Sequence, residues 1–178
     1  MIHNMNNNKV KIFAITFIVN IIVGMLFNAM NMMAYDFNHL YFSVTLFYVG
    51  CIMASNMVWS HEIIHYLTMK HFDIKMFLFG IILTLFFVYL ARNQIGVNTD
   101  QWLRRMIPHH STALTTSEKL LEKIGNQDTN NTNNINNNTN GKNDKKVYRL
   151  AKDIVFNQNA EIHYMKTFLK NNKYNQNK

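Results

Sequence analysis

The stretch IKMFLFGIILTLFFVYL, at residues 74–90, decides the fold class of the first half of this chain. It is almost wholly apolar, and Arg92 follows it closely. A helix needs about 20 apolar residues to cross the hydrocarbon core of a bilayer. Two similar stretches precede it, at about residues 12–33 and 39–59. Residues 1–91 are therefore predicted to form a membrane domain of three helices, the third of them near residues 74–91.

Short polar joints separate the three apolar stretches, at residues 34–38 and 60–73. Such joints place successive helices antiparallel, so the prediction is a three-helix hairpin bundle. The alternative for the first stretch is a secretory signal peptide, but its apolar run is long and lacks a clear cleavage site. By the lysines and arginines nearest the membrane, we expect the N-terminus in the cytoplasm and the polar tail outside it.

The charge balance of the chain is basic, with a net charge of +8 over 178 residues and a pI of about 9.6. The lysines and arginines are spread along the helix flanks and the tail, and no basic patch is interleaved with aromatic residues. The balance therefore indicates a membrane-flanking surface, and no nucleic-acid partner is expected. The single cysteine, Cys51, excludes a disulfide within one chain.

The polar tail, residues 98–172, predicts an antiparallel hairpin of two helices. Its first helix opens with residues that can cap it, namely Asn98, Thr99 and Asp100. Gly125 is expected to end that helix. Residues 126–144 are dominated by Asn and predict a disordered linker. The linker holds two N-glycosylation sequons, at Asn130 and Asn137. The second helix is predicted from about residue 145 to residue 170.

Polar side chains interrupt the apolar stripes of both tail helices. On a helical wheel, His109 and His110 straddle the apolar face of the first helix. Gln158 and Glu161 fall on the apolar face of the second, whereas His163 falls on its opposite face. At 1.5 Å per residue, His110 and Glu161 both lie about 21 Å from the hairpin end, so the two polar pairs should meet. Leaving them buried without partners would cost a few kcal/mol each.

Two methionines, Met106 and Met165, lie on the same stripes about one turn away. Imidazole, thioether and carboxylate groups together favour a transition metal, and thioethers favour copper(I) over zinc. Pro108 is expected to kink the first helix beside the histidines. Two interpretations stay open. One is a buried His–Glu network that fixes helix register. The other is a metal site formed by Met106, His109, His110, Gln158, Glu161 and Met165.

The run from Trp102 to His110, WLRRMIPHH, with Asp100 before it, resembles the opening motif of the domain-of-unknown-function 305 family. Residues 150–165, LAKDIVFNQNAEIHYM, resemble the partner motif of that family. The resemblance covers the tail helices, and the front half is similar to that of membrane-anchored bacterial members. It implies a ferritin-like helical domain. Some members are associated with copper binding or tolerance outside the cytoplasm, which implies copper ligands at Met106, His109, His110 and Met165.

The chain departs from that family in holding one helix pair where many relatives hold two, and in the inserted Asn-rich linker. Two helices alone make a poor hydrophobic core. We therefore expect two chains to pair into a four-helix bundle, which makes each tail one half of a ferritin-like domain.

The sequence His61-Glu62-Ile63-Ile64-His65 matches the zinc metallopeptidase signature HExxH. It falls at the end of the second membrane stretch, in a predicted joint, and His71 does not follow at a recognised zincin spacing. Catalysis is therefore not expected. The alternative is a non-catalytic metal site formed by His61, His65 and His71. A further group of donors suits entry of a soft metal, namely Met30, Met32, Met33, Asp36 and His39.

These observations predict a membrane-anchored metal-binding protein that sequesters or hands on copper and catalyses no reaction. The alternative hypothesis is an anchored module that dimerises or docks a partner, with His109, His110 and Glu161 as a structural network. A membrane metallopeptidase acting through His61, Glu62 and His65 is the third hypothesis. The expected partners are the lipid bilayer and a second copy of the chain.

Overall fold

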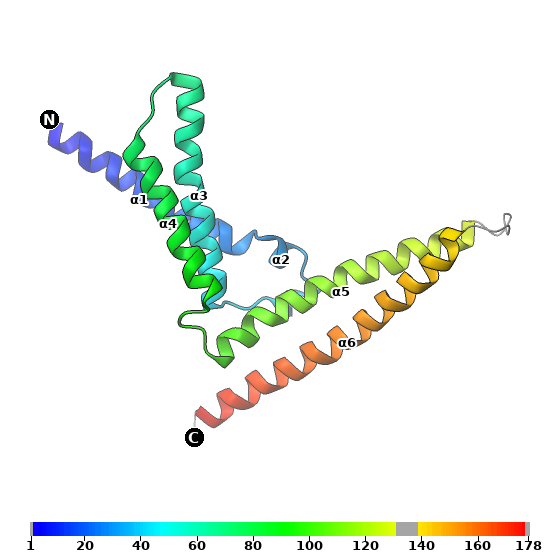
Figure 1. Ribbon diagram of the computed structural model, residues 1–178. Helices are drawn as coiled ribbons and strands as arrows, with labels where there is room; N and C mark the ends of the chain where they lie inside the picture. Colours follow the sequence, from blue (N-terminus) through cyan, green and yellow to red (C-terminus); the bar gives the residue numbers. More distant parts are fainter. Residues whose placement is uncertain (1, 131–138, 177–178) are drawn as a thin grey trace. The chain divides into compact units, whose positions relative to one another are not determined.

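The computed structural model describes the backbone of residues 2–130 and 139–176, and the side chains of residues 10–125 and 145–172. Over these residues the secondary structure is entirely helical, so the predicted all-α class is confirmed (Figure 1). The chain forms two compact units. Unit 1 comprises Met1–Asn28 and Phe42–Trp102, and unit 2 comprises Ala29–Tyr41 and Leu103–Lys178.

Unit 1 is built from three helices, α1 (Ile2–Leu26), α3 (Val44–Met69) and α4 (Ile74–Arg92). Helix α3 packs against both α1 and α4. Glycines allow α3 to approach α1 and α4 closely. A Cβ added at Gly50 of α3 would lie 2.7 Å from the backbone oxygen of Ile21 in α1. A Cβ added at Gly80 of α4 would lie 2.8 Å from the backbone nitrogen of Trp59 in α3.

The first helix ends earlier than predicted, because α1 stops at Leu26 and the expected helix ran to residue 33. The side chain of Asn28 donates to the backbone carbonyl of Met25 at 2.7 Å, in place of a continuing helical bond. Asn side chains compete in this way with the backbone hydrogen bonds of a helix. The next four residues form a separate short helix, α2 (Ala29–Met32), which belongs to unit 2.

The second helix is shifted along the chain relative to the predicted 39–59. It begins after Ser43, whose side-chain oxygen accepts from the amide of Leu46 at 3.1 Å as an N-cap. It continues past the predicted end at residue 59 to Met69, a stretch that holds no Gly or Pro. It ends at Lys70, which has the left-handed φ of 57°. The predicted joint 60–73 is therefore mostly helix.

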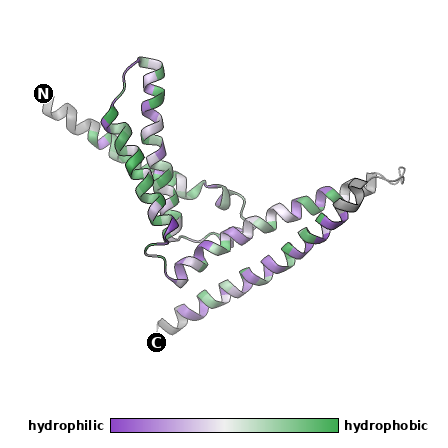
Figure 2. Cartoon of the chain, viewed as in Figure 1, coloured by the Kyte–Doolittle hydropathy of each residue, from purple (hydrophilic) through white to green (hydrophobic). Residues whose placement is uncertain are grey.

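Helix α4 is a candidate membrane span by its length and composition. Asp73 caps it by accepting from the amides of Lys75 and Met76, and Arg92 is its last residue. Among the described residues it is the one helix long and apolar enough to cross a bilayer, and almost none of it is buried in this structure. In Figure 2 the ribbon of α4 is coloured mostly as hydrophobic. A core helix of a water-soluble domain would be mostly buried. A shorter apolar segment, Val10–Leu26, lies in α1.

Unit 2 contains α2, a 3-10 helix η1 (Phe37–His39), and two long helices, α5 (Thr99–Asn130) and α6 (Thr139–Gln176). Helix α5 begins in unit 1, and its side chains from Leu103 on belong to unit 2. Helix α6 runs back antiparallel to α5 (Figure 1). The two long helices share one hydrophobic cluster, formed by Leu103, Ile107, Leu114, Ile162, Met165 and Leu169.

The ends of the long helices differ in part from the predictions. Asn98 caps α5 as expected, since its side-chain oxygen accepts from the amide of Gln101 at 2.9 Å. Gly125 was predicted to end α5, but the helix continues to Asn130. An interior Gly costs a helix only about 1 kcal/mol relative to Ala and does not force it to stop. Residues 126–130 and 139–144, predicted as parts of a disordered linker, are helical instead. The remainder of the predicted linker, residues 131–138 with Asn137 among them, lies outside the described residues.

Candidate functional site

The polar residues predicted to meet between the tail helices do so at His110 and Glu161. Nδ1 of His110 lies 2.8 Å from Oε2 of Glu161. The same carboxylate oxygen accepts from the side-chain amide of Gln158 at 3.4 Å. The His110 contact is short, but its angles are not those of a hydrogen bond. We therefore describe it as an ion pair that forms when the imidazole is protonated.

This ion pair lies at the edge of the hydrophobic cluster. The His110 side chain is 15% exposed and that of Glu161 is 53% exposed. Water screens a pair of this exposure, so its contribution to stability is on the order of 1 kcal/mol or less. The pair connects α5 to α6.

The other predicted ligands are placed differently. Met165 is buried in the hydrophobic cluster, and Met106 packs against that cluster. His109 is exposed, and its ring centroid lies 5.8 Å from that of His110. Among the described residues, no group of three or more His, Cys, Asp or Glu side chains is arranged to hold a metal ion. The structure thus brings together His110, Gln158 and Glu161 as a polar network, with the two methionines in the adjoining core.

The HExxH motif lies inside α3 and not in a joint. The rings of His61 and His65 stack at 6.0 Å, and the ring of His71 lies 5.5 Å from that of His65. Glu62, which would act as general base in a peptidase, accepts from the backbone amide of Asp73 at 3.3 Å. Nδ1 of His65 is 3.2 Å from the carbonyl of His71. These polar groups bridge the end of α3 to the start of α4.

The proposed soft-metal group around residue 30 is divided by the fold. Met32 and Met33 are exposed, and Asp36 caps η1 through a 2.7 Å hydrogen bond from the amide of Asn38. His39 is instead buried, with Nδ1 2.9 Å from Oγ of Ser111 on α5. Sequence reasoning missed this contact, since its two residues are 72 positions apart and Ser111 carries no pattern of its own.

Several further bonds tie residues 29–41 to α5. The backbone amide of Tyr35 donates to Oγ of Ser111 at 2.7 Å. The hydroxyl of Thr112 lies 3.1 Å from the carbonyl of Met30 and donates to it. A hydrogen bond to Glu118 raises the pKa of the Tyr35 hydroxyl. The segment is thus held on α5 by backbone as well as side-chain groups.

The protonation of His39 follows from its surroundings. Burial lowers its pKa below the usual 6.5, and the positive charge of Lys166 lowers it further, while Asp36 opposes both. Oγ of Ser111 accepts from the Tyr35 amide and lies 2.9 Å from Nδ1 of His39. A neutral ring that accepts the Ser111 proton at Nδ1 carries its own proton on Nε2.

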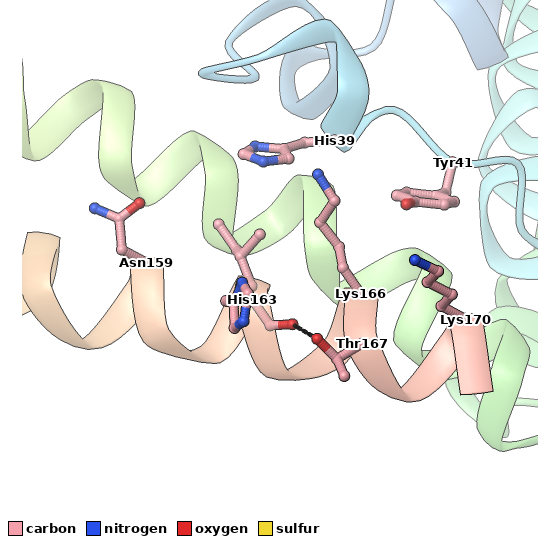
Figure 3. Close-up of a pocket in the computed structure, with 8 residues that line it drawn as sticks. His39, Tyr41, Asn159, His163, Lys166, Thr167 and Lys170 are labelled. Carbon is pink, nitrogen blue, oxygen red and sulfur yellow. Dashed lines mark hydrogen bonds between the residues drawn. The ribbon is translucent and has the colours of Figure 1, made fainter. Parts of the chain in front are cut away.

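An open pocket of about 560 Å³ lies beside His39 in unit 2. Figure 3 shows its lining. Helix α6 contributes most of the lining, including Lys166 and Lys170, and the segment after η1 contributes His39 and Tyr41. None of the lining residues is acidic. His163, which sequence analysis placed on the solvent side of α6, also borders this pocket.

The chain is similar to an uncharacterized protein of Acanthamoeba polyphaga mimivirus, with 28% identity over 168 residues that cover 93% of each chain. The similarity therefore extends over the sequence of both units. No family model matches the chain, and no solved structure matches it. The resemblance of the tail to the domain-of-unknown-function 305 family stays a prediction.

Proposed function

We propose that this protein is a membrane-anchored, non-catalytic interaction module whose α5–α6 hairpin pairs with a second copy of the chain. Apolar side chains left exposed on α6 carry this proposal. Leu150 and Tyr164 are 60% and 67% exposed, and both lie at heptad spacing with Asn157 between them. Phe168 continues the line one turn later, and its ring centroid lies 6.5 Å from that of Tyr164.

A line of this spacing is the seam that a second helix covers in a coiled coil or a helical bundle. A hairpin of two helices buries only one face of each. Pairing with a second copy through a two-fold axis would cover the seam and complete four helices. An Asn within such a seam favours one register, which suits a specific dimer.

The experiment is to measure the mass of the full chain in detergent micelles by light scattering, with cross-linking as a second readout. We expect a dimer, and we expect Leu150→Glu with Tyr164→Glu to shift it to monomer. Phe156→Glu is the matched control, because Phe156 is 75% exposed on another face of α6. A monomeric wild type, or equal dissociation by the control, would reject the proposed dimer.

The anchor in this proposal is the whole three-helix bundle of unit 1, with α4 as its most hydrophobic member. The close helix approaches at Gly50 and Gly80 support it, because small residues at helix interfaces are typical of packing within lipid. Apolar side chains of α1 also face outward, Ile15 and Ile18 among them. The tail lies on the side opposite the cytoplasm by the charge distribution described above.

Copper binding between α5 and α6 is the second candidate function. The observation that favours it is the convergence of His110, Glu161 and Gln158 from two helices, with Met106 and Met165 nearby. The experiment is a copper and zinc titration of the full chain beside His109→Ala/His110→Ala. Stoichiometric copper binding that the double variant loses would favour this function. An absence of binding in a folded wild type would leave the network structural.

A further inference from the structure

The pocket of unit 2 is lined by positive charge without a matching carboxylate. Lys166 and Lys170 lie one turn apart on α6 and both border it. Among the residues whose side chains are described, no Asp or Glu lies within salt-bridge distance of either ammonium group. Asp36 acts electrostatically on His39 from the segment before it, and it does not line the pocket. An anion would therefore find uncompensated cations here.

Neutral groups add hydrogen-bond donors to the two lysines. The Ser111 hydroxyl at Nδ1 leaves Nε2–H of His39 as a donor. Tyr41 supplies a hydroxyl. Asn159 supplies a side-chain amide with one N–H left after its bond to the carbonyl of Val155. In Figure 3 the ammonium end of Lys166 lies below the His39 ring, and that of Lys170 lies toward Tyr41. The donors thus come from both α6 and the segment held on α5.

The dimensions of the pocket indicate more than an inorganic ion. Its volume of about 560 Å³ falls within the range of small-molecule sites. The Tyr41 ring and Ile162 provide an apolar wall. Two lysine charges with hydrogen-bond donors suit a phosphate oxyanion, which binds lysine as a point charge.

We propose that this pocket binds the phosphate group of an organic phosphate, held by Lys166 and Lys170, with His39 and Tyr41 as neutral donors. The organic part lies along Tyr41 and Ile162. The phosphate belongs either to a free small molecule or to a lipid headgroup, and the chemistry of recognition is the same for both. The proposal does not depend on the dimer or on copper, because neither the α6 seam nor Glu161 lines the pocket.

The experiment uses the full chain in neutral detergent micelles and two probes. One probe is phenyl phosphate in solution, and the other is phosphatidic acid mixed into the micelles. Binding is read from the shift of the unfolding temperature and from a titration. We expect Lys166→Gln/Lys170→Gln to weaken binding by about tenfold or more, because charge-assisted hydrogen bonds are lost. Added salt should weaken binding through screening.

Two controls keep the result interpretable. Lys146→Gln/Lys152→Gln removes the same charge from exposed positions of α6 outside the pocket, so it should change binding by less than about twofold. Lys166→Arg/Lys170→Arg keeps the charge and should retain binding. Circular dichroism of each variant reports whether the helices still form.

The outcomes separate the sources of the phosphate and decide the proposal. Saturable binding of phenyl phosphate that the pocket variant loses supports a free organic phosphate. Binding of phosphatidic acid alone, lost in the same variant, supports a lipid headgroup. An absence of binding for both probes overturns the proposal, and so does equal binding by wild type and pocket variant. Equal loss in the Lys146/Lys152 control also overturns it, because the attraction would then follow net charge.

Discussion

Ser111 shows how much of unit 2 depends on single side chains. It is fully buried in α5, and its hydroxyl serves both the backbone amide of Tyr35 and the ring of His39. A buried donor or acceptor that loses its partner costs about 1–3 kcal/mol. Burial among these groups, with the positive charge of Lys166, lowers the pKa of His39. The lowered pKa leads to a measurable dependence on pH.

We predict that the stability of unit 2 falls as the pH drops below 6.5, the ordinary pKa of His. The folded state lowers the pKa of His39, so between that lowered value and 6.5 the unfolded chain binds more protons. Stability therefore rises with pH through this window and is level above it. The measurement is amide hydrogen exchange of α5 across the window. His39→Gln should flatten the dependence, and an unchanged slope would assign it to other groups.

We predict a small coupling between His110 and Glu161. A double-mutant cycle with His110→Ala and Glu161→Gln should give about 0.2–1 kcal/mol, because water screens the half-exposed carboxylate. The unfolding free energies of the four chains measure it. A coupling of several kcal/mol would mean that the pair is desolvated in solution, for example by a second chain over Glu161.

The contact between His110 and Glu161 could be foreseen because both lie on regular helices, where residue counting gives distance. The contact between His39 and Ser111 could not. His39 opens the second predicted apolar stretch, so its sequence neighbourhood indicates the start of a membrane helix. Its partner is 72 residues away, and only tertiary packing brings the two together. Local pattern carries no information about such a contact.

Helix starts were foreseen where the local pattern is strong. The apolar run predicted the start of α4 at Ile74, and the capping residue Asn98 predicted that of α5. The end of α1 was not foreseen, because Asn28 acts there through a side-chain bond to Met25 that an apolar run conceals. The extension of α3 through the HExxH sequence was not foreseen either. Its polar residues indicate a joint between apolar stretches, although they are equally compatible with a helix.

We predict opposite effects of alanine at two glycines. Gly80→Ala should destabilise unit 1 by about 1–3 kcal/mol, because its Cβ would lie 2.8 Å from the backbone nitrogen of Trp59. Gly125→Ala should stabilise α5 by about 0.5–1 kcal/mol, because its Cβ would meet nothing within 4 Å. Unfolding in mixed micelles measures both. A neutral Gly80→Ala would show that α3 and α4 can separate slightly without cost.

At the scale of the whole molecule, unit 2 is discontinuous in sequence. It takes Ala29–Tyr41 from before α3 and α4, and Leu103–Lys178 from after them. The sequence predicted a boundary between a membrane half and a tail, because hydropathy changes near residue 92. Hydropathy indicates whether a segment prefers water or an apolar environment, but it does not indicate which segments pack against each other. The segment 29–41, which hydropathy grouped with the membrane half, packs on α5 in unit 2.

We predict that the tail faces the lumen when the chain is made in microsomes. The sequons at Asn130 and Asn137 provide the readout, since glycosylation occurs only on that side. A mass shift that glycosidase removes, and that Asn130→Gln/Asn137→Gln abolishes, is the expected result. A chain that stays unmodified while a sequon engineered into the N-terminus is glycosylated would place the tail in the cytoplasm.

The hydrogen bond from the Tyr35 amide to Ser111 spans 76 residues of chain, and this has a consequence during synthesis. A ribosome adds about 5–20 residues per second, so Tyr35 is synthesised roughly 4–15 s before Ser111. During that interval the segment 29–41 has no surface to dock on, while α3 and α4 are being completed. A nascent chain halted before α5 would hold this segment accessible to a protease, and release of the halt would protect it.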